Sequence, residues 1–108
     1  MKLKDKGEIL LDTGVYKEVP CNLLDYKVGE YTLKLLLHSS EQPWSVGMLD
    51  ISEYKTGYRL TSTNKSVSSS TMKDVDTVVK KFIEEHGIDK ILAKIDLFLS
   101  NSNRKIEW

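Results

Sequence analysis

The sequence has almost no cysteine, because Cys21 is the only one among its 108 residues. A lone thiol cannot form an intramolecular disulfide, and it cannot supply the several thiolates of a closed structural zinc site. The fold must therefore be held by an ordinary hydrophobic core. Scarce cysteine is also typical of proteins in a reducing compartment, so we expect a cytoplasmic, intracellular location.

Long apolar runs are also absent, since the longest are triplets such as Leu35, Leu36 and Leu37. A membrane-spanning helix needs about 20 apolar residues, and a signal peptide needs an apolar stretch of about 7–15. The N-terminal segment contains lysines, but its apolar run at residues 9–11 is too short for a signal peptide. We therefore expect neither a signal peptide nor a contact with a membrane.

Neither sign of charge is in excess, because 16 basic residues balance 16 acidic ones. Nucleic-acid affinity rests largely on cations that neutralise phosphates. Arginine, the residue best suited to reading guanine, occurs only as Arg59 and Arg104. Sequence-specific binding of duplex DNA is therefore not expected. The content of 40% hydrophobic and 30% charged residues is typical of a globular protein. We interpret residues 1–108 as one α+β domain with loose tails at 1–7 and 101–108.

Alternating apolar and polar residues predict an antiparallel sheet in the N-terminal part of the chain. Turns that end in glycine, at residues 12–14 and 55–57, separate short stretches of this alternation. We expect strands at residues 8–11, 15–19, 31–38, 46–54 and 58–63. One face is strongly apolar and carries Leu33, Leu35, Leu37, Leu49, Ile51, Tyr58 and Leu60. The other face is mixed and includes Leu36, His38, Asp50, Ser52, Arg59 and Thr61.

After residue 70 the apolar period changes to that of a helix. Thr71 with Asp74 predicts a capping box at a helix N-terminus, and Gly87 predicts a left-handed C-terminal cap. A second apolar stripe starts near Asp89 and stops at the polar run 100–103. The predicted fold class is therefore α+β. It consists of an antiparallel β-meander of four to five strands, followed by two amphipathic C-terminal helices packed on one face.

No residues show the spacing of a catalytic or metal-binding set. Cys21 with His38 or His86 would pair a nucleophile with a base, but we expect Cys21 to lie in a loop as a small hydrophobe. Asp50 and Glu53 fall on opposite sides of their strand, and the glycines are isolated. We predict no catalytic residue, no metal site and no cofactor. An enzyme with a pocket between sheet and helices is a less favoured alternative.

The mixed sheet face is the predicted binding site. It combines aromatic, aliphatic and cationic residues, as binding surfaces do, and the helices are not needed to cover it. We therefore expect this face to be open. Trp44 lies in a polar loop at its rim, where it either contacts a partner or folds back over the core. The predicted partner-binding residues are Tyr16, Lys34, Leu36, His38, Trp44, Met48, Tyr54 and Arg59.

The function favoured by this pattern is that of a small non-enzymatic binding or inhibitor-type protein. It would act through protein–protein contact with a partner of unknown identity, in the manner of a bacterial or phage accessory protein. Leu97 lies opposite the apolar stripe of the second helix. Together with Leu36 and Met48 it adds apolar surface, which makes a homodimer a further expectation.

Two segments, LDISEY at 49–54 and GYRLTS at 57–62, precede a helix capped by Thr71. Over about residues 49–87 this order resembles the family of single-stranded DNA-binding coactivators. The resemblance implies a dimer that holds single strands against its sheets. The alternative function is therefore a single-stranded nucleic-acid-binding protein that uses the open sheet face. The neutral charge and the two similar helices depart from that family.

Overall fold

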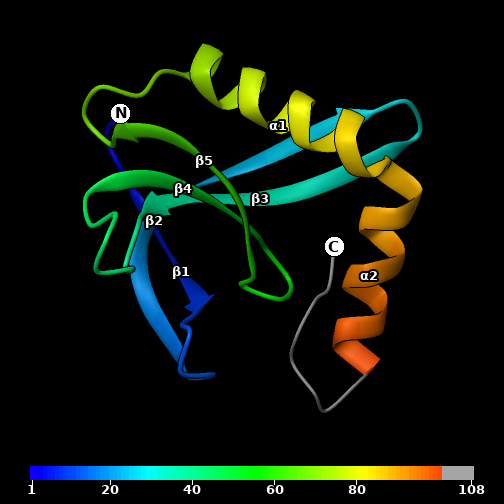
Figure 1. Ribbon diagram of the computed structural model, residues 1–108, viewed down its shortest axis with the longest axis horizontal. Coiled ribbons are helices and arrows are strands. Elements are labelled where there is room, and N and C mark those ends of the chain that lie inside the picture. Colours follow the sequence, from blue (N-terminus) through cyan, green and yellow to red (C-terminus); the bar gives the residue numbers. More distant parts are fainter. Residues whose placement is uncertain (101–108) are drawn as a thin grey trace.

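Residues 1–100, the part of the chain that this computed structural model describes, fold into five antiparallel strands and two helices. The strands form one sheet in the order β1-β2-β3-β4-β5, and both helices follow the last strand (Figure 1). The predicted α+β meander with two C-terminal helices is therefore confirmed. The elements are β1 (Asp5–Leu10), β2 (Tyr16–Val28), β3 (Tyr31–Ser39), β4 (Met48–Glu53), β5 (Arg59–Ser66), α1 (Met72–His86) and α2 (Ile88–Ser100).

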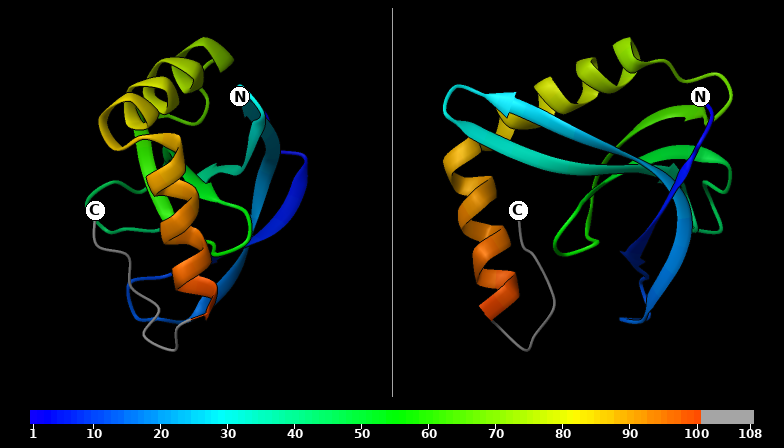
Figure 2. Two further views of the ribbon diagram at one scale, coloured as in Figure 1. Left: turned by 90° about the vertical axis from the view of Figure 1, so that its right-hand side faces the viewer. Right: turned by 180° about the vertical axis from the view of Figure 1, so that it is seen from behind.

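The main core lies between the sheet and the two helices. Alternate side chains of a strand point to the same face, so β3 and β4 present a continuous apolar surface toward the helices. α1 packs along this face, and α2 turns sharply away from α1 at Gly87 (Figure 2). The buried residues of this core are Leu33, Leu35, Leu37, Leu49, Ile51, Val75, Val79, Phe82, Ile91 and Ile95.

The start of α1 is the predicted capping box. The Asp74 N–H donates to Thr71 Oγ1 at 3.3 Å, and the Thr71 N–H donates to the Asp74 carboxylate at 2.9 Å. The hydrogen bond from Lys65 and that from Thr71 lower the pKa of Asp74 to about 2. Gly87 follows α1 with a φ of 83° as expected, but its ψ of 133° lies outside the left-handed helical region. No helix within residues 1–100 is long and apolar enough to cross a membrane.

β2 is longer than the predicted strand 15–19 and extends to Val28. Its first half pairs with β1 and its second half pairs with β3. Val19 and Cys21 are buried on the mixed face of the sheet, whereas Leu24 and Tyr26 pack against the main core on the other face. The buried face therefore changes within the strand. Cys21 lies in β2 and not in a loop, so that expectation was wrong.

A second, smaller core lies on the face that we expected to be open. β1 covers this face, and Ile9, Val19, Cys21 and Leu36 are buried together there. The N-terminal segment is correspondingly ordered, because Asp5 already belongs to β1 and the N-terminal ammonium donates to the carbonyl of residue 67 at 2.7 Å. Residues 1–7 are thus part of the fold and not a loose tail. The expected tail at 101–108 lies outside the described residues.

The sheet curls, so that the end of β1 meets the turn between β4 and β5 (Figure 2). The Leu10 N–H donates to the carbonyl of Gly57 at 2.9 Å. Gly57 has a φ of 68°, and a β-carbon placed on it would lie 2.9 Å from the Leu10 nitrogen. Only glycine allows both this backbone conformation and this close approach. The curl creates a hollow at the end of the mixed face.

Candidate functional site

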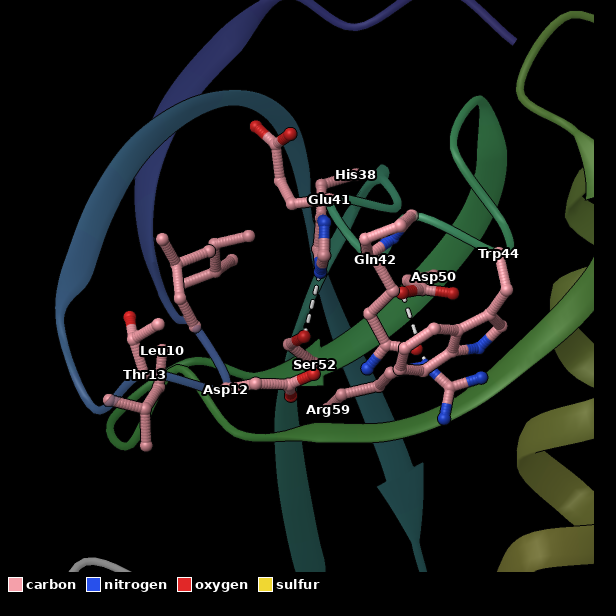
Figure 3. Close-up of a pocket in the computed structure, with 13 residues that line it drawn as sticks. Leu10, Asp12, Thr13, His38, Glu41, Gln42, Trp44, Asp50, Ser52 and Arg59 are labelled. Carbon is pink, nitrogen blue, oxygen red and sulfur yellow. Dashed lines mark hydrogen bonds and ion pairs between the residues drawn. The ribbon is translucent and has the colours of Figure 1, made fainter.

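A pocket of about 360 Å³ lies where the end of β1, the loop 40–47 and strands β3, β4 and β5 come together (Figure 3). Its floor is formed by polar side chains of the three strands. The rest of the lining comes from β1, the residues that follow it and the loop, and it mixes apolar side chains with polar ones. The lining residues are Ile9, Leu10, Leu11, Asp12, Thr13, His38, Glu41, Gln42, Pro43, Trp44, Asp50, Ser52 and Arg59.

His38 and Ser52 form one half of the floor. His38 Nδ1 lies 2.9 Å from the carbonyl oxygen of Ser39, and its Nε2 lies 2.7 Å from Ser52 Oγ. A carbonyl can only accept, so Nδ1 carries the proton and Nε2 accepts from the Ser52 hydroxyl. Burial lowers the pKa of His38, which favours the same neutral imidazole.

Asp50 and Arg59 form the other half of the floor. Asp50 is buried, and its Oδ2 lies 3.1 Å from Arg59 Nε, which makes an ion pair by distance. The Arg59 Nε–H is nevertheless not directed at that oxygen well enough for a hydrogen bond. Among residues 1–100, neither Asp50 Oδ1 nor Arg59 Nε has a hydrogen-bond partner, although both atoms are buried.

Arg59 reaches this floor because β5 is irregular. Ile51 pairs with Thr61 but Ser52 pairs with Arg59, so Leu60 is an extra residue in β5. Paired residues of antiparallel strands point to the same face, which places Arg59 with Ser52 and Thr61 with Ile51. The sequence prediction placed Arg59 and Thr61 on one face, and it was wrong for Thr61.

The rim of the pocket is the loop 40–47, which is held by its own hydrogen bonds. The Ser40 and Ser45 hydroxyls lie 2.7 Å apart, and the Ser45 N–H donates to the carbonyl of Gln42 at 3.0 Å. An ion pair of 2.7 Å between Lys17 and Glu41 ties the loop to β2. Trp44 lines the pocket from this loop and is 73% exposed, so it does not fold back over the core.

The structure divides the predicted partner-binding residues into three groups. His38, Trp44 and Arg59 line the pocket, as Figure 3 shows. A neighbouring hollow on the other side of β1 is lined by residues of the second group, Tyr16, Leu36 and Tyr54. Lys34 and Met48 line neither of these two hollows.

Contrary to our expectation, several of these residues are not accessible to a partner. Leu36 is 1% exposed because β1 covers it, and the Tyr16 hydroxyl donates to the carbonyl of Thr56 at 2.9 Å. Tyr54 keeps half of its surface exposed. The expectation of an open sheet face is therefore wrong, and the accessible part of that face is reduced to the hollows at the margins of β1.

Asp50 and Ser52 are the main site residues that the sequence prediction missed. Both were placed on the mixed face, but neither was assigned to the site. The strand register carries the missing information, because Asp50 pairs with His38 and Ser52 pairs with Arg59. Register depends on how the loop 40–47 closes and on the extra residue in β5, and alternation alone does not report either.

The floor has some features of a nucleophile and its base. A serine that donates to a neutral imidazole can pass its proton to that imidazole. Here burial lowers the pKa of His38 and weakens it as a base, and Nδ1 bonds to a carbonyl in place of a carboxylate. Cys21 pairs with His38 in register, but burial, with a smaller effect of Asp5, raises the pKa of the thiol. Cys21 is therefore a protonated core residue.

Within residues 1–100 no three His, Cys, Asp or Glu side chains cluster as metal ligands would. Comparison with protein-family models, curated proteins and solved structures found no match to this chain. The function must therefore be argued from the pocket and its rim.

Proposed function

We propose that the chain is a non-enzymatic binding protein that acts through protein–protein contact, with the pocket beside Trp44 as its contact site. The observation that carries this proposal is the position of the Trp44 indole, which is exposed at the rim of a pocket whose lining includes several apolar side chains. Binding energy in protein interfaces is concentrated in a few residues, and tryptophan is enriched among them.

The rim loop supports this role because its internal hydrogen bonds hold it in one conformation. A loop that is ordered before binding loses less conformational entropy when a partner docks. Val46, in the same loop, is 69% exposed but does not line the pocket. Trp44 and Val46 therefore form a matched pair of exposed apolar residues that differ in their relation to the pocket.

The charges around the pocket favour a protein over a nucleic acid. Among residues 1–100, three carboxylates, those of Asp12, Glu41 and Asp50, line the pocket beside a single cation, Arg59. Carboxylates repel phosphates, and affinity for nucleic acid depends on cations that neutralise them. A single-stranded nucleic-acid-binding protein is thus the less favoured alternative.

Affinity capture from native lysate tests the proposal, with wild type, Trp44→Ala and Val46→Ala as baits. We expect wild type and Val46→Ala to retain the same protein, and Trp44→Ala to lose it. Equal capture by all three baits would contradict the proposal. Binding of oligonucleotides with a steep dependence on salt would replace it with the nucleic-acid alternative.

Labelling with a fluorophosphonate probe tests the non-enzymatic part of the proposal. We expect no adduct on Ser52, because its hydroxyl is buried and its base is weak. A stoichiometric adduct that disappears in Ser52→Ala and in His38→Gln would show an activated serine and contradict this part.

A further inference from the structure

We propose that the floor of the pocket recognises a carboxamide group, which donates an N–H to Asp50 Oδ1 and accepts a hydrogen bond from Arg59 Nε. This inference rests on the proposed function in that it takes the same pocket as the binding site. It adds the chemistry of the group that the pocket receives.

The floor holds a buried acceptor and a buried donor, neither of them hydrogen-bonded within residues 1–100. Asp50 is 2% exposed, and its Oδ1 is a buried acceptor without a hydrogen-bond partner among residues 1–100. Arg59 Nε is a buried donor that lies 3.1 Å from Asp50 Oδ2 in an ion pair but makes no hydrogen bond to residues 1–100. Buried polar atoms in folded proteins are nearly always hydrogen-bonded, so an orphaned donor beside an orphaned acceptor indicates a ligand that supplies both partners.

The charges of the floor favour a neutral ligand. The carboxylate of Asp50 and the guanidinium of Arg59 neutralise each other, and His38 and Ser52 already satisfy one another. A carboxylate ligand would meet Asp50 and an ammonium ligand would meet Arg59, so each would face a like charge. A neutral amide avoids both repulsions and offers a donor and an acceptor in one plane.

The size and lining of the pocket also bear on the ligand. A volume of about 360 Å³ lies at the lower end of the range of about 300–1,000 Å³ found for small-molecule sites. Apolar side chains, among them Leu10, Leu11 and Pro43, form part of the lining. The pocket therefore suits one aromatic or aliphatic body that carries the amide inward.

Benzamide is a suitable probe, with three relatives of the same shape as controls. Acetophenone has a methyl group in place of the NH₂ and so lacks the donor, benzoate carries a negative charge, and benzamidine carries a positive charge. We expect benzamide to bind at least about tenfold more tightly than each control in an NMR titration of the labelled protein. The backbone amide signals of the protein that shift should be those of the strands that line the pocket. Equal or tighter binding of any one control would overturn the proposal.

Two variants locate the contacts. In Asp50→Asn the remaining oxygen can face Arg59, which puts an NH₂ group where Oδ1 was and removes the acceptor. Arg59→Lys keeps the charge but removes the Nε–H. We expect each variant to weaken benzamide binding about tenfold or more, whereas Tyr54→Ala, outside this pocket, should bind as wild type does. If Asp50→Asn unfolds, Arg59→Lys decides. A folded Arg59→Lys variant that binds benzamide normally would contradict the proposal.

Competition distinguishes a carboxamide on a protein from one on a free small molecule. If excess benzamide displaces the partner captured by the wild-type bait, the partner supplies the amide. If benzamide binds without displacing the partner, the pocket binds the amide of a free small molecule. The two proposals fail separately. Capture of the partner by the Trp44→Ala bait would contradict the proposed function, and a lack of preference for benzamide would contradict the carboxamide inference.

Discussion

His38 lies in the pocket floor with both ring nitrogens hydrogen-bonded, one to the Ser52 hydroxyl and one to the carbonyl of Ser39. Burial is the largest influence on this ring and lowers its pKa, against a smaller opposing effect of the Ser39 carbonyl. The folded protein thus keeps a neutral imidazole at a pH where the unfolded chain, with an ordinary pKa of about 6.5, already binds a proton.

This shift predicts how stability depends on pH. Below about pH 6.5 the unfolded state binds more protons than the folded state, so the free energy of unfolding should fall with acidification and be level above that pH. Urea denaturation at a series of pH values measures this, with His38→Gln as the non-titrating control. Asp74 loses its stabilisation at lower pH, from near its ordinary pKa of 3.8 down through its folded-state pKa of about 2, so the test for His38 uses the range above pH 5. A decline of the same size in His38→Gln would contradict the assignment to His38.

Cys21 is fully buried in the second core, and its pKa is raised. A disulfide reagent should react completely with the thiol of the unfolded chain. Over the same time we expect no reaction with the thiol of the folded protein. Cys21→Ser should cost about 1–3 kcal/mol of stability, because the new hydroxyl is buried without an arranged partner. Rapid reaction of the native thiol would show that β1 does not cover this face.

At the scale of the elements, Phe82 connects α1 to the main core. It is 7% exposed, and its ring lies 4.5 Å from that of His86. Phe82→Ala should lower the free energy of unfolding by about 3–5 kcal/mol. The neighbouring Lys81 is exposed, so Lys81→Ala should change stability by less than about 0.5 kcal/mol. Similar denaturation midpoints for the two variants would mean that α1 does not pack as described.

The contact between β1 and the β4–β5 turn can be tested with a pair of glycines. Gly14 and Gly57 both have positive φ, but a β-carbon on Gly14 meets open space, whereas one on Gly57 meets the backbone of β1. Gly14→Ala should cost about 1–2 kcal/mol for its backbone conformation alone. Gly57→Ala should cost clearly more, because it also displaces β1. Equal losses in thermal or urea denaturation would argue against this contact.

The elements differ in how far the sequence could predict them. α1 and the apolar face of β3 follow one period throughout and have recognisable ends, so they were predicted correctly. The second half of β2 was missed because Cys21 is buried on one face and Leu24 on the other, which hides the alternation. The pocket floor was predicted in part, since the register that pairs Ser52 with Arg59 and brings Arg59 to Asp50 includes an extra residue that no local pattern signals.

At the scale of the whole molecule, both faces of the sheet are covered, one by the helices and one by β1. This weakens the case for a homodimer, because Leu36 is buried within the chain. The exposed apolar residues that remain on α2 are Leu97, at 61%, and Leu99, at 50%. If the chain pairs with a second copy, Leu97→Glu should convert a dimer to a monomer in light scattering. A wild-type monomer at high micromolar concentration would remove the homodimer.

Binding of a partner at the pocket beside Trp44 is tested most directly by the dissociation constants of matched variants for the captured partner. Trp44→Ala should raise the dissociation constant by about 30-fold or more, as the loss of an interface hot spot does, with an unchanged melting temperature. Val46→Ala, equally exposed in the same loop but outside the pocket lining, should bind within about threefold of wild type. Normal binding by Trp44→Ala, with weakened binding by Val46→Ala or Tyr54→Ala, would contradict the account.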